Sequence, residues 1–256
     1  MKVYKEENFI YKVFYTSEID EDMKAQYIAV HNEVFKSSFN IEDFKIKYED
    51  DIYGDSIHVI VYKDDYPCAI RTLWRNDCND IVCYQPCDTG VLPSARGGGI
   101  FMKMTKIALN YIDVDKYDIY NFPNENSRRL YLKNGWRICS VSYVSVFLSN
   151  RLYNEHSDRV IPDEYVKWYL PGNKPKLYLK KIGNSNYLVK LKGKCACIII
   201  GKISPVIADS GLFQRIRGRI TFYRTVKKPL LMIRPLYIVT TSKEDKSFDT
   251  WRIDAI

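Results

Sequence analysis

Three consecutive glycines form the stretch of this sequence that is best suited to bind an anion. Gly97, Gly98 and Gly99 follow a segment suited to a buried strand and precede a helix-like segment. Consecutive glycines let backbone N–H groups approach a ligand closely, and the N-terminus of the following helix adds partial positive charge. The loop therefore predicts a cradle for a pyrophosphate group, although the same glycines would also suit a plain strand-to-helix turn. It matches neither the Gly-x-Gly-x-x-Gly fingerprint of dinucleotide-binding proteins nor the Gly-Lys-Ser/Thr ending of a P-loop.

A second motif lies at residues 124–136 and reads Asn-Glu-Asn-Ser-Arg-Arg-Leu-Tyr-Leu-Lys-Asn-Gly-Trp. Together with Val-x-Pro-x-x-Arg-Gly-x-Gly-Ile at residues 91–100, it resembles the motifs of the GNAT superfamily of acyl-CoA-dependent N-acetyltransferases. Arg96 and Gly99 match the family's Gln/Arg-x-x-Gly-x-Gly/Ala motif, and Phe101 replaces its last small residue. The later family motif, Asn-x-x-Ala/Ser-x-x-Leu-Tyr-x-Lys-x-Gly-Phe, is matched by Asn124, Ser127, Leu130, Tyr131, Lys133 and Gly135, with Trp136 in place of Phe.

The resemblance implies a fold and a division of the chain. The expected fold class is α/β (α+β), with a mixed, splayed central sheet flanked by helices. The resemblance rests on the sequence over about residues 15–148 and only on the order of elements beyond. The run Phe122-Pro123-Asn124 also resembles a bacterial subgroup whose members carry a second, degenerate GNAT-like half. We therefore expect an acyl-CoA-binding domain over residues 1–150 and a degenerate GNAT-like domain over residues 151–256.

The same resemblance implies how acetyl-CoA would be held as co-substrate. Backbone groups of Gly90 and Val91 would pair with the pantetheine arm as a further strand would. Asn124 would contact the same arm where the two central strands splay apart. The pyrophosphate would be held by the backbone N–H groups of Arg96, Gly97, Gly98, Gly99 and Ile100.

The resemblance also implies one catalytic residue, and it leaves another open. Tyr131 would donate its phenolic proton to the departing CoA thiolate, which helps because a thiol has a pKa of about 8.5. In several family members, a Glu in the fourth strand removes the proton of the amine. Gln85 stands at that position and cannot act as a base. Asp88, Glu33, His31 and an ordered water all remain candidates for the base.

Hydrophobic spacing predicts the elements that position these residues in the first half. A strand over 9–15 comes first, and a helix capped by Ser17 or Asp20 then runs to Phe35. A short helix capped by Asn40 follows at 41–50. The remaining predicted elements are strands over 57–62, 68–74 and 81–87, a helix over 99–112, a strand over 117–122, a helix over 127–134 and a β-rich segment over 136–148.

The second half repeats the order of elements found in the first. Its predicted elements are a helix over 163–170, a hairpin over 176–182 and 187–192, a buried strand over 195–203, a helix over 211–224 and a strand over 230–239. Hairpin, buried strand, helix and strand already occur in this order at 57–122. The sequence therefore predicts a degenerate structural repeat.

The net charge of +8 is concentrated in the second half. Residues 1–150 hold 18 Lys and Arg against 22 Asp and Glu, and residues 151–256 hold 21 against 9. The excess fits either a solvated surface or an anionic partner such as a nucleotide, a polyanion or RNA. The counterpart of the glycine loop, at 204–211, has one glycine and Asp209, so we expect no second CoA site there. The basic run of this half is Arg215, Arg217, Arg219, Arg224, Lys227 and Lys228, which we expect on the helix over 211–224 and just after it.

Composition excludes several classes of protein. The chain has 256 residues, of which 46% are hydrophobic and 14% aromatic, enough to fill a core. No apolar run approaches the roughly 18 residues of a membrane span, and the charged N-terminus does not resemble a secretory signal. Seven cysteines without a Cys-x-x-Cys pair favour free thiols in a reducing cytoplasm, and the three separated histidines do not predict a metal site.

The first functional hypothesis is therefore a cytoplasmic N-acetyltransferase that transfers an acetyl (acyl) group from acetyl-CoA to a primary amine by direct attack. Its acceptor would be a small molecule or a peptide. A Fem-type, aminoacyl-tRNA-dependent transferase is the alternative enzyme, because those proteins are also tandem GNAT-like and the basic half would suit tRNA. A module that binds acyl-CoA without turnover is the alternative outside catalysis. Neither the oligomeric state nor the acceptor follows from the sequence.

Overall fold

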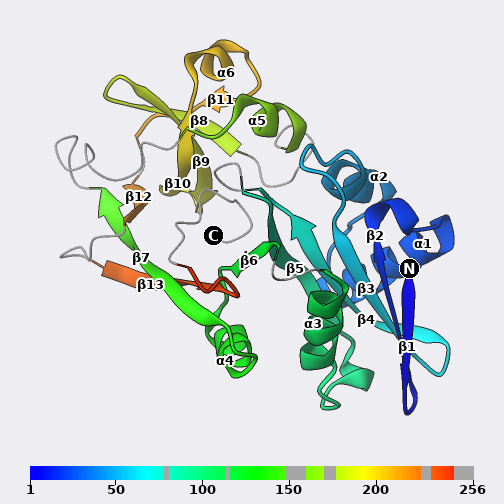
Figure 1. The fold of residues 1–256 in the computed structure, drawn as a ribbon. Helices are drawn as coiled ribbons and strands as arrows, with labels where there is room; N and C mark the ends of the chain where they lie inside the picture. The colour runs from blue at the N-terminus through cyan, green and yellow to red at the C-terminus, as the bar shows by residue number, and fades with distance from the viewer. Residues whose placement is uncertain are drawn as a thin grey trace. The chain divides into compact units, whose positions relative to one another are not determined.

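The computed structural model describes residues 1–77, 81–112, 116–147, 160–169, 177–218, 220–225 and 232–244. The chain divides into two compact units, each built from strands and helices (Figure 1). Unit 1 comprises the described residues of Met1–Arg137 and Val239–Phe248, and unit 2 comprises those of Ile138–Ile238. No helix within the described ranges is both long enough and apolar enough to cross a membrane.

Unit 1 is built on a mixed sheet. Its strands, in spatial order, are β1 (Lys2–Glu6), β2 (Phe9–Tyr15), β3 (Ile57–Lys63), β4 (Tyr66–Arg75), β5 (Cys83–Val91), β6 (Asp118–Asn121) and the end of β13 (Met232–Thr240). All neighbours are antiparallel except β5 and β6, which run parallel. A parallel pair needs a crossover connection, and helix α3 (Ile100–Tyr111) lies within it.

Helices cover both faces of this sheet. One face is covered by helices α1 (Glu21–Phe35) and α2 (Ile41–Phe44). Asp20 is the N-cap of α1, and the short helix α2 continues into a π-helical turn at Lys45–Glu49. Helices α3 and α4 (Glu125–Lys133) belong to the other.

The alternation of side chains along the strands supports this division, because successive residues of a strand point to opposite faces. His58 makes ring contacts with Tyr27 of α1 and Phe44 of α2. Its neighbour Ile57 instead belongs to the buried cluster that contains Met104 of α3. The sheet is therefore covered on both sides.

Strands β5 and β6 are joined at one end only. Cys83 pairs with Asp118 and Tyr84 with Ile119, and the described residues of these strands form no further pair with each other. Beyond Tyr84, β5 therefore diverges from β6 toward its end at Val91. This divergence is the predicted splay, and with it the predicted class of a mixed, splayed sheet flanked by helices is confirmed.

Unit 2 has its own sheet, in which β10 (Ala196–Ile203) is buried along most of its length. Its strands, in spatial order, are β7 (Arg137–Phe147), β12 (Ile220–Thr225), β10, β9 (Ser185–Lys192), β8 (Leu177–Ile182) and β11 (Gln214–Arg215). Helix α5 (Asp163–Tyr169) precedes the β8–β9 hairpin, and helix α6 (Pro205–Asp209) follows β10. Strands β10 and β12 run parallel, as β5 and β6 do. The order of hairpin, strand, helix and parallel strand thus occurs once in each unit.

Each sheet also contains a strand from the other half of the chain. In unit 1, the neighbour of β6 is the end of β13, where Val239 pairs with Asn121 and Thr240 with Tyr120. Val239 is fully buried in the core of unit 1, and the Thr240 hydroxyl donates a hydrogen bond to the Ile119 carbonyl at 2.8 Å. In unit 2, the antiparallel neighbour of β12 is β7, which precedes all other elements of that unit. Unit 1 is therefore built from two separate segments of the chain.

The predicted helix over 211–224 is wrong. The structure has β11 and β12 in this segment, and Gly218 between them adopts a φ of +66°, which a helix does not permit. The β-branched and aromatic run Thr221-Phe222-Tyr223 fits a strand, and its pairing with both β10 and β7 stabilises it. The helix that follows the buried strand of this half is instead α6. The first strand, β1, is an addition that the sequence pattern did not predict, because most of its residues are exposed.

The other predicted elements are present with small shifts of their ends. The helix predicted over 127–134 begins earlier, as α4 at Glu125, because Asn124 caps it. The ends of some other predicted elements lie outside the described residues, namely residues 148, 170, 176, 230 and 231. Three residues of the basic run also lie outside them: Arg219, Lys227 and Lys228.

A fragment that ends at Asn150 should fail to unfold cooperatively, because it lacks the β13 residues that complete unit 1. Thermal unfolding followed by circular dichroism checks this expectation. Joining residues 232–244 to the fragment through a flexible Gly/Ser linker should restore a cooperative transition. A fragment 1–150 that melts as sharply without the added strand would contradict the role of β13 in unit 1.

Candidate active site

The glycine loop joins the end of β5 to the start of α3. Gly97 and Gly99 adopt φ values of +96° and +69°, in the left-handed region where glycine is favoured. Gly99 is the N-cap of α3, and no side chain caps this end of the helix. The N–H groups of the first helical turn have no partner within a helix, so here they remain free for an anion.

Two contacts fix the start of this loop. A Cβ atom at Gly90 would lie 2.9 Å from Cγ1 of Val34, so glycine is needed there for the close packing of α1 on β5. The Nε of Arg96 donates a hydrogen bond to the Val91 carbonyl at 3.1 Å and so folds the side chain back over the end of the strand.

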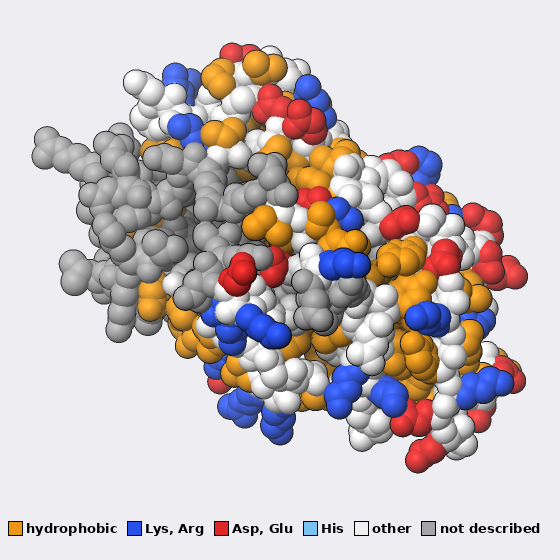
Figure 2. Space-filling view, in the orientation of Figure 1, with side chains coloured by type: hydrophobic (Ala, Val, Ile, Leu, Met, Phe, Trp, Pro, Cys, Tyr) orange, Lys and Arg blue, Asp and Glu red, His pale blue; other side chains and the backbone are white. Residues whose placement is uncertain are grey.

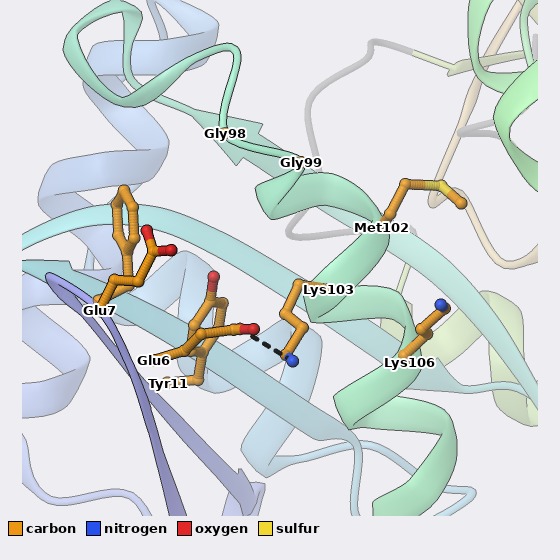
Figure 3. A pocket seen from close by; sticks show the side chains of 9 residues that line it. Glu6, Glu7, Tyr11, Gly98, Gly99, Met102, Lys103 and Lys106 are labelled. Carbon is orange, nitrogen blue, oxygen red and sulfur yellow. Dashed lines mark ion pairs between the residues drawn. The ribbon is translucent and has the colours of Figure 1, made fainter.

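A pocket of about 310 Å³ opens beside Gly98 and Gly99, between the β1–β2 hairpin and α3. Figure 3 shows Lys103, Lys106 and Met102 projecting from α3, and Glu6, Glu7 and Tyr11 projecting from the hairpin. Lys103 forms an ion pair with Glu6 at 2.8 Å. The pocket thus combines aromatic, cationic and anionic side chains next to the loop.

Tyr131 lies on α4, with 2% of its surface exposed. Its position depends on Asn124, whose side-chain oxygen accepts hydrogen bonds from the Ser127 backbone N–H and hydroxyl at 2.9 and 3.0 Å. This cap starts α4 and turns Tyr131 toward the sheet. The Asn124 oxygen is therefore engaged by the helix, and contact with the pantetheine arm through its amide nitrogen stays a prediction.

Arg71 of β4 is a site residue that the sequence analysis missed. Its side chain is fully buried, and its Nη2 donates a hydrogen bond to the Tyr131 hydroxyl at 3.1 Å. Phe101, the residue that departs from the family pattern, stacks on the guanidinium with a distance of 5.0 Å to the ring centroid. Nothing in the local sequence distinguishes Arg71 from Arg75, which is less buried and pairs with Asp77.

A β-bulge places a carboxylate on the opposite face. The register shifts so that Asp88 and Thr89 of β5 lie opposite Arg71 alone, and Asp88 adopts a φ of +41°. The Lys47 ammonium lies 3.2 Å from both carboxylate oxygens of Asp88, and the Tyr48 hydroxyl donates a short hydrogen bond to it. Although burial raises the pKa of Asp88, Lys47 and His31 lower it below its ordinary value. The carboxylate therefore stays ionised.

Of the three residues proposed as the base, the structure brings two together. His31 Nε2 lies 3.8 Å from the Asp88 carboxylate, and its Nδ1 lies 3.0 Å from the Ser37 hydroxyl. Burial lowers the pKa of His31, so the imidazole is neutral at neutral pH. Glu33 is exposed. Gln85 accepts a hydrogen bond from the Asn76 amide at 2.9 Å.

The counterpart loop of unit 2 lacks the features of the glycine loop. Helix α6 begins directly after β10, and the Ser204 hydroxyl caps it by accepting a hydrogen bond from the Ile207 N–H at 3.2 Å. Asp209 is ion-paired with Arg215 at 2.9 Å. Of the basic run, Arg215 lies on β11, Arg224 on β12 and Arg217 between these strands, rather than on a helix. Arg215 and Arg217 line a pocket of about 430 Å³ together with Lys180 and Lys181. On the face of the molecule that Figure 2 shows, acidic and basic side chains are interspersed.

No group of three or more His, Cys, Asp or Glu side chains in the described part of the chain is arranged to hold a metal ion. Anion binding and proton transfer are the chemistry that the described side chains favour.

The pH dependence of stability should reveal the buried His58. Burial lowers the pKa of His58 to about 3, and both ring nitrogens lie 3.0 Å from hydroxyls, those of Thr16 and Thr72. Below pH ~6.5 the unfolded chain gains a proton at this position that the folded chain does not, so folding should lose about 1.4 kcal/mol per pH unit. Chemical denaturation between pH 7 and 4 should show a flatter dependence for His58→Gln. The same slope in both proteins would contradict the neutral, buried state of His58.

Comparisons with known proteins agree on the fold. No protein-family model and no curated protein matches this sequence. The structure is similar to a GCN5-related N-acetyltransferase from Kribbella flavida, with 10% identity, a TM-score of 0.56 and coverage of 90% of this chain and 71% of that one. It is also similar to a GCN5-related N-acetyltransferase from Anabaena variabilis (12% identity, TM-score 0.55, coverage 90% and 72%). A conserved protein of unknown function from Enterococcus faecalis gives 10% identity, a TM-score of 0.57 and coverage of 90% and 72%. The chain therefore has the fold of the GCN5-related N-acetyltransferases.

Proposed function

We propose that this protein belongs to the GNAT superfamily and is an acyl-CoA-dependent N-acyltransferase that transfers an acetyl group from acetyl-CoA to a primary amine. The observation that carries the proposal is the splay between β5 and β6. It lies between the uncapped N-terminus of α3 and the hydroxyl of Tyr131, which are the two parts that such a reaction needs.

The residues around the splay fit the shape and charge of acetyl-CoA. The backbone of Gly90 and Val91 would pair with the pantetheine arm, because the side of β5 that faces β6 is not paired there. The N–H groups from Arg96 to Ile100 would hold the pyrophosphate, since the left-handed glycines leave the loop backbone exposed. The adjoining pocket would take the adenosine end, with Lys106 near its phosphate. Asn124 would contact the pantetheine arm through its amide nitrogen.

Acetyl-CoA supplies an activated carbonyl, and the chain's own residues would guide its transfer. A backbone N–H near Val91 would stabilise the negative charge that develops on the carbonyl oxygen during attack by a neutral amine. Tyr131 would protonate the departing sulfur. The buried position of Tyr131 excludes bulk water from this proton transfer.

His31 is the best-placed group to accept the proton of the amine. It lies on the face of β5 opposite Tyr131, and the direction of its pKa keeps it neutral. Asp88 would stabilise the imidazolium that forms, while Lys47 and Tyr48 hold this carboxylate in place. The acceptor amine would then approach from the side of α1 and α2.

The acceptor class is a small molecule or a peptide with a primary amine. The free state of the six cysteines that the structure describes supports a reducing, cytoplasmic location. A free-thiol assay with acetyl-CoA and a mixture of amines, with and without charged tRNA, separates the three functions. Thiol release that needs no tRNA supports the proposal. Dependence on charged tRNA would favour a Fem-type transferase, and CoA binding without thiol release would favour a binding module.

Replacing Gly99 should abolish the binding of acetyl-CoA, because a side chain there would crowd the backbone cradle. Gly99→Val should lose the increase in Tm that acetyl-CoA produces in the native protein. Gly193→Val is the matched control, since Gly193 has a φ of +68° against +69° for Gly99 and lies in a turn of unit 2 with equally open surroundings. The control should keep the full shift, and calorimetry should give one CoA per chain. An unchanged shift in folded Gly99→Val, or two CoA per chain, would contradict this assignment.

Removing the hydroxyl of Tyr131 should slow turnover without weakening the binding of CoA. Tyr131→Phe should lower kcat by about 10- to 1,000-fold, the range expected for the loss of a general acid. Steady-state kinetics give kcat, and calorimetry gives the affinity for CoA. An equal loss of affinity and rate would point to a packing role for Tyr131 instead.

A further inference from the structure

Arg71 is a buried cation that is not neutralised by a carboxylate in the described part of the chain. Its side chain is fully buried, and the ion pairs of these residues do not include it. Nη1 donates a weak hydrogen bond to the Thr89 hydroxyl at 3.4 Å, and no acceptor is found for the Nε hydrogen. A buried charge that lacks a paired counter-charge is costly, so such an arrangement persists where the charge has a use.

The hydrogen bonds around Tyr131 fix the direction of its own proton. The hydroxyl oxygen accepts from Arg71 Nη2 at 3.1 Å and from Asn121 Nδ2 at 2.9 Å. Arginine can only donate, and the Asn121 amide is oriented because its oxygen accepts from the Phe122 N–H at 2.8 Å. With both acceptor positions of the oxygen used, its hydrogen points away from Arg71 and Asn121. No described residue accepts this hydrogen bond.

We infer that Arg71 is the positioning residue of the acid step: it holds the Tyr131 hydroxyl so that the proton faces the sulfur of the bound thioester, and it stabilises the phenolate left behind. This inference rests on the proposed function. In the step, the oxyanion left by attack of the amine re-forms the carbonyl double bond as the carbon–sulfur bond breaks, and the electron pair of that bond goes to sulfur. The phenolic proton moves to the same sulfur, and the phenolate regains a proton from solvent after CoA has left. Arg71 itself gains and loses no proton.

Among the contacts that the described residues make with Tyr131, Arg71 is the single charged side chain. Asn121 of β6, Thr89 of β5, Phe101 of α3 and Trp136 after α4 are all uncharged. The aromatic rings of Phe101 and Trp136 exclude water, which strengthens the interaction between the guanidinium and a phenolate. A merely structural arginine would need neither this dry setting nor a hydroxyl whose proton is left free.

The test compares Arg71→Lys, which keeps the charge, with Arg71→Gln, which keeps hydrogen-bond donors but not the charge. Each is made in the full-length native chain and in the Tyr131→Phe background. Thiol release from acetyl-CoA with a mixture of amines gives kcat and KM, and Tm checks the fold. Arg75→Met is the matched control, because Arg75 lies on the same strand and over another tyrosine, Tyr84, but pairs with Asp77.

In the native background, Arg71→Gln should lower kcat by about 30-fold and Arg71→Lys by less than about 5-fold, with KM for acetyl-CoA changed by less than about 3-fold. In the Tyr131→Phe background, the two substitutions should differ by less than about 2-fold, because no phenolate forms. Arg75→Met should leave kcat unchanged.

Equal losses of kcat in both backgrounds would overturn the inference, since Arg71 would then act independently of Tyr131. A loss that appears in KM alone, or equal rates for the lysine and glutamine variants, would also overturn it. Failure of the proposed function has a different signature. In that case, the native protein itself would release no thiol.

Discussion

The divergence of β5 from β6 is the constraint on which the rest of unit 1 depends. Among the described residues, β5 pairs with β6 only through Cys83 and Tyr84, and α3 lies in the crossover that this parallel pair needs. This crossover places the N-terminus of α3 beside the open end of β5. The glycine loop, the end of β5 that diverges from β6 and the hydroxyl of Tyr131 therefore meet in one region.

The bulge in β5 adds a second consequence. Because Asp88 and Thr89 lie opposite Arg71 alone, the strand sends a carboxylate to one face and a hydroxyl to the other. On β4, the guanidinium of Arg71 and the hydroxyl of Thr72 likewise point to opposite faces, since neighbouring residues of a strand alternate. Charged groups thus lie on both sides of the same two strands, with Arg71 and Tyr131 on one face and Asp88, Lys47 and His31 on the other. The proposed proton donor and the proposed proton acceptor therefore lie on opposite faces of the sheet.

The two units share an order of elements but not the local chemistry. In unit 1, the helix after the central strand begins at a left-handed glycine without a side-chain cap. In unit 2, the corresponding helix begins at Ser204, whose hydroxyl occupies the N–H of Ile207, and Asp209 adds a carboxylate nearby. One such helix start can receive an anion and the other is already satisfied. Unit 1 nevertheless takes its last strand, the end of β13, from a segment that follows unit 2 in the chain.

The sequence by itself determined the features that depend on near neighbours along the chain. The glycine loop, the Asn124 cap of α4, the position of Tyr131 and most strands follow from periodicity, capping and turn chemistry, which act over a few residues. Only the tertiary structure decided the rest. Arg71 is a buried partner of Tyr131, and the segment after Gly211 forms strands. Asp88 and His31 form a pair, while Glu33 is exposed. Strand β13 completes unit 1. Each of these depends on burial or on strand pairing between residues far apart in the chain, and no local pattern encodes such contacts.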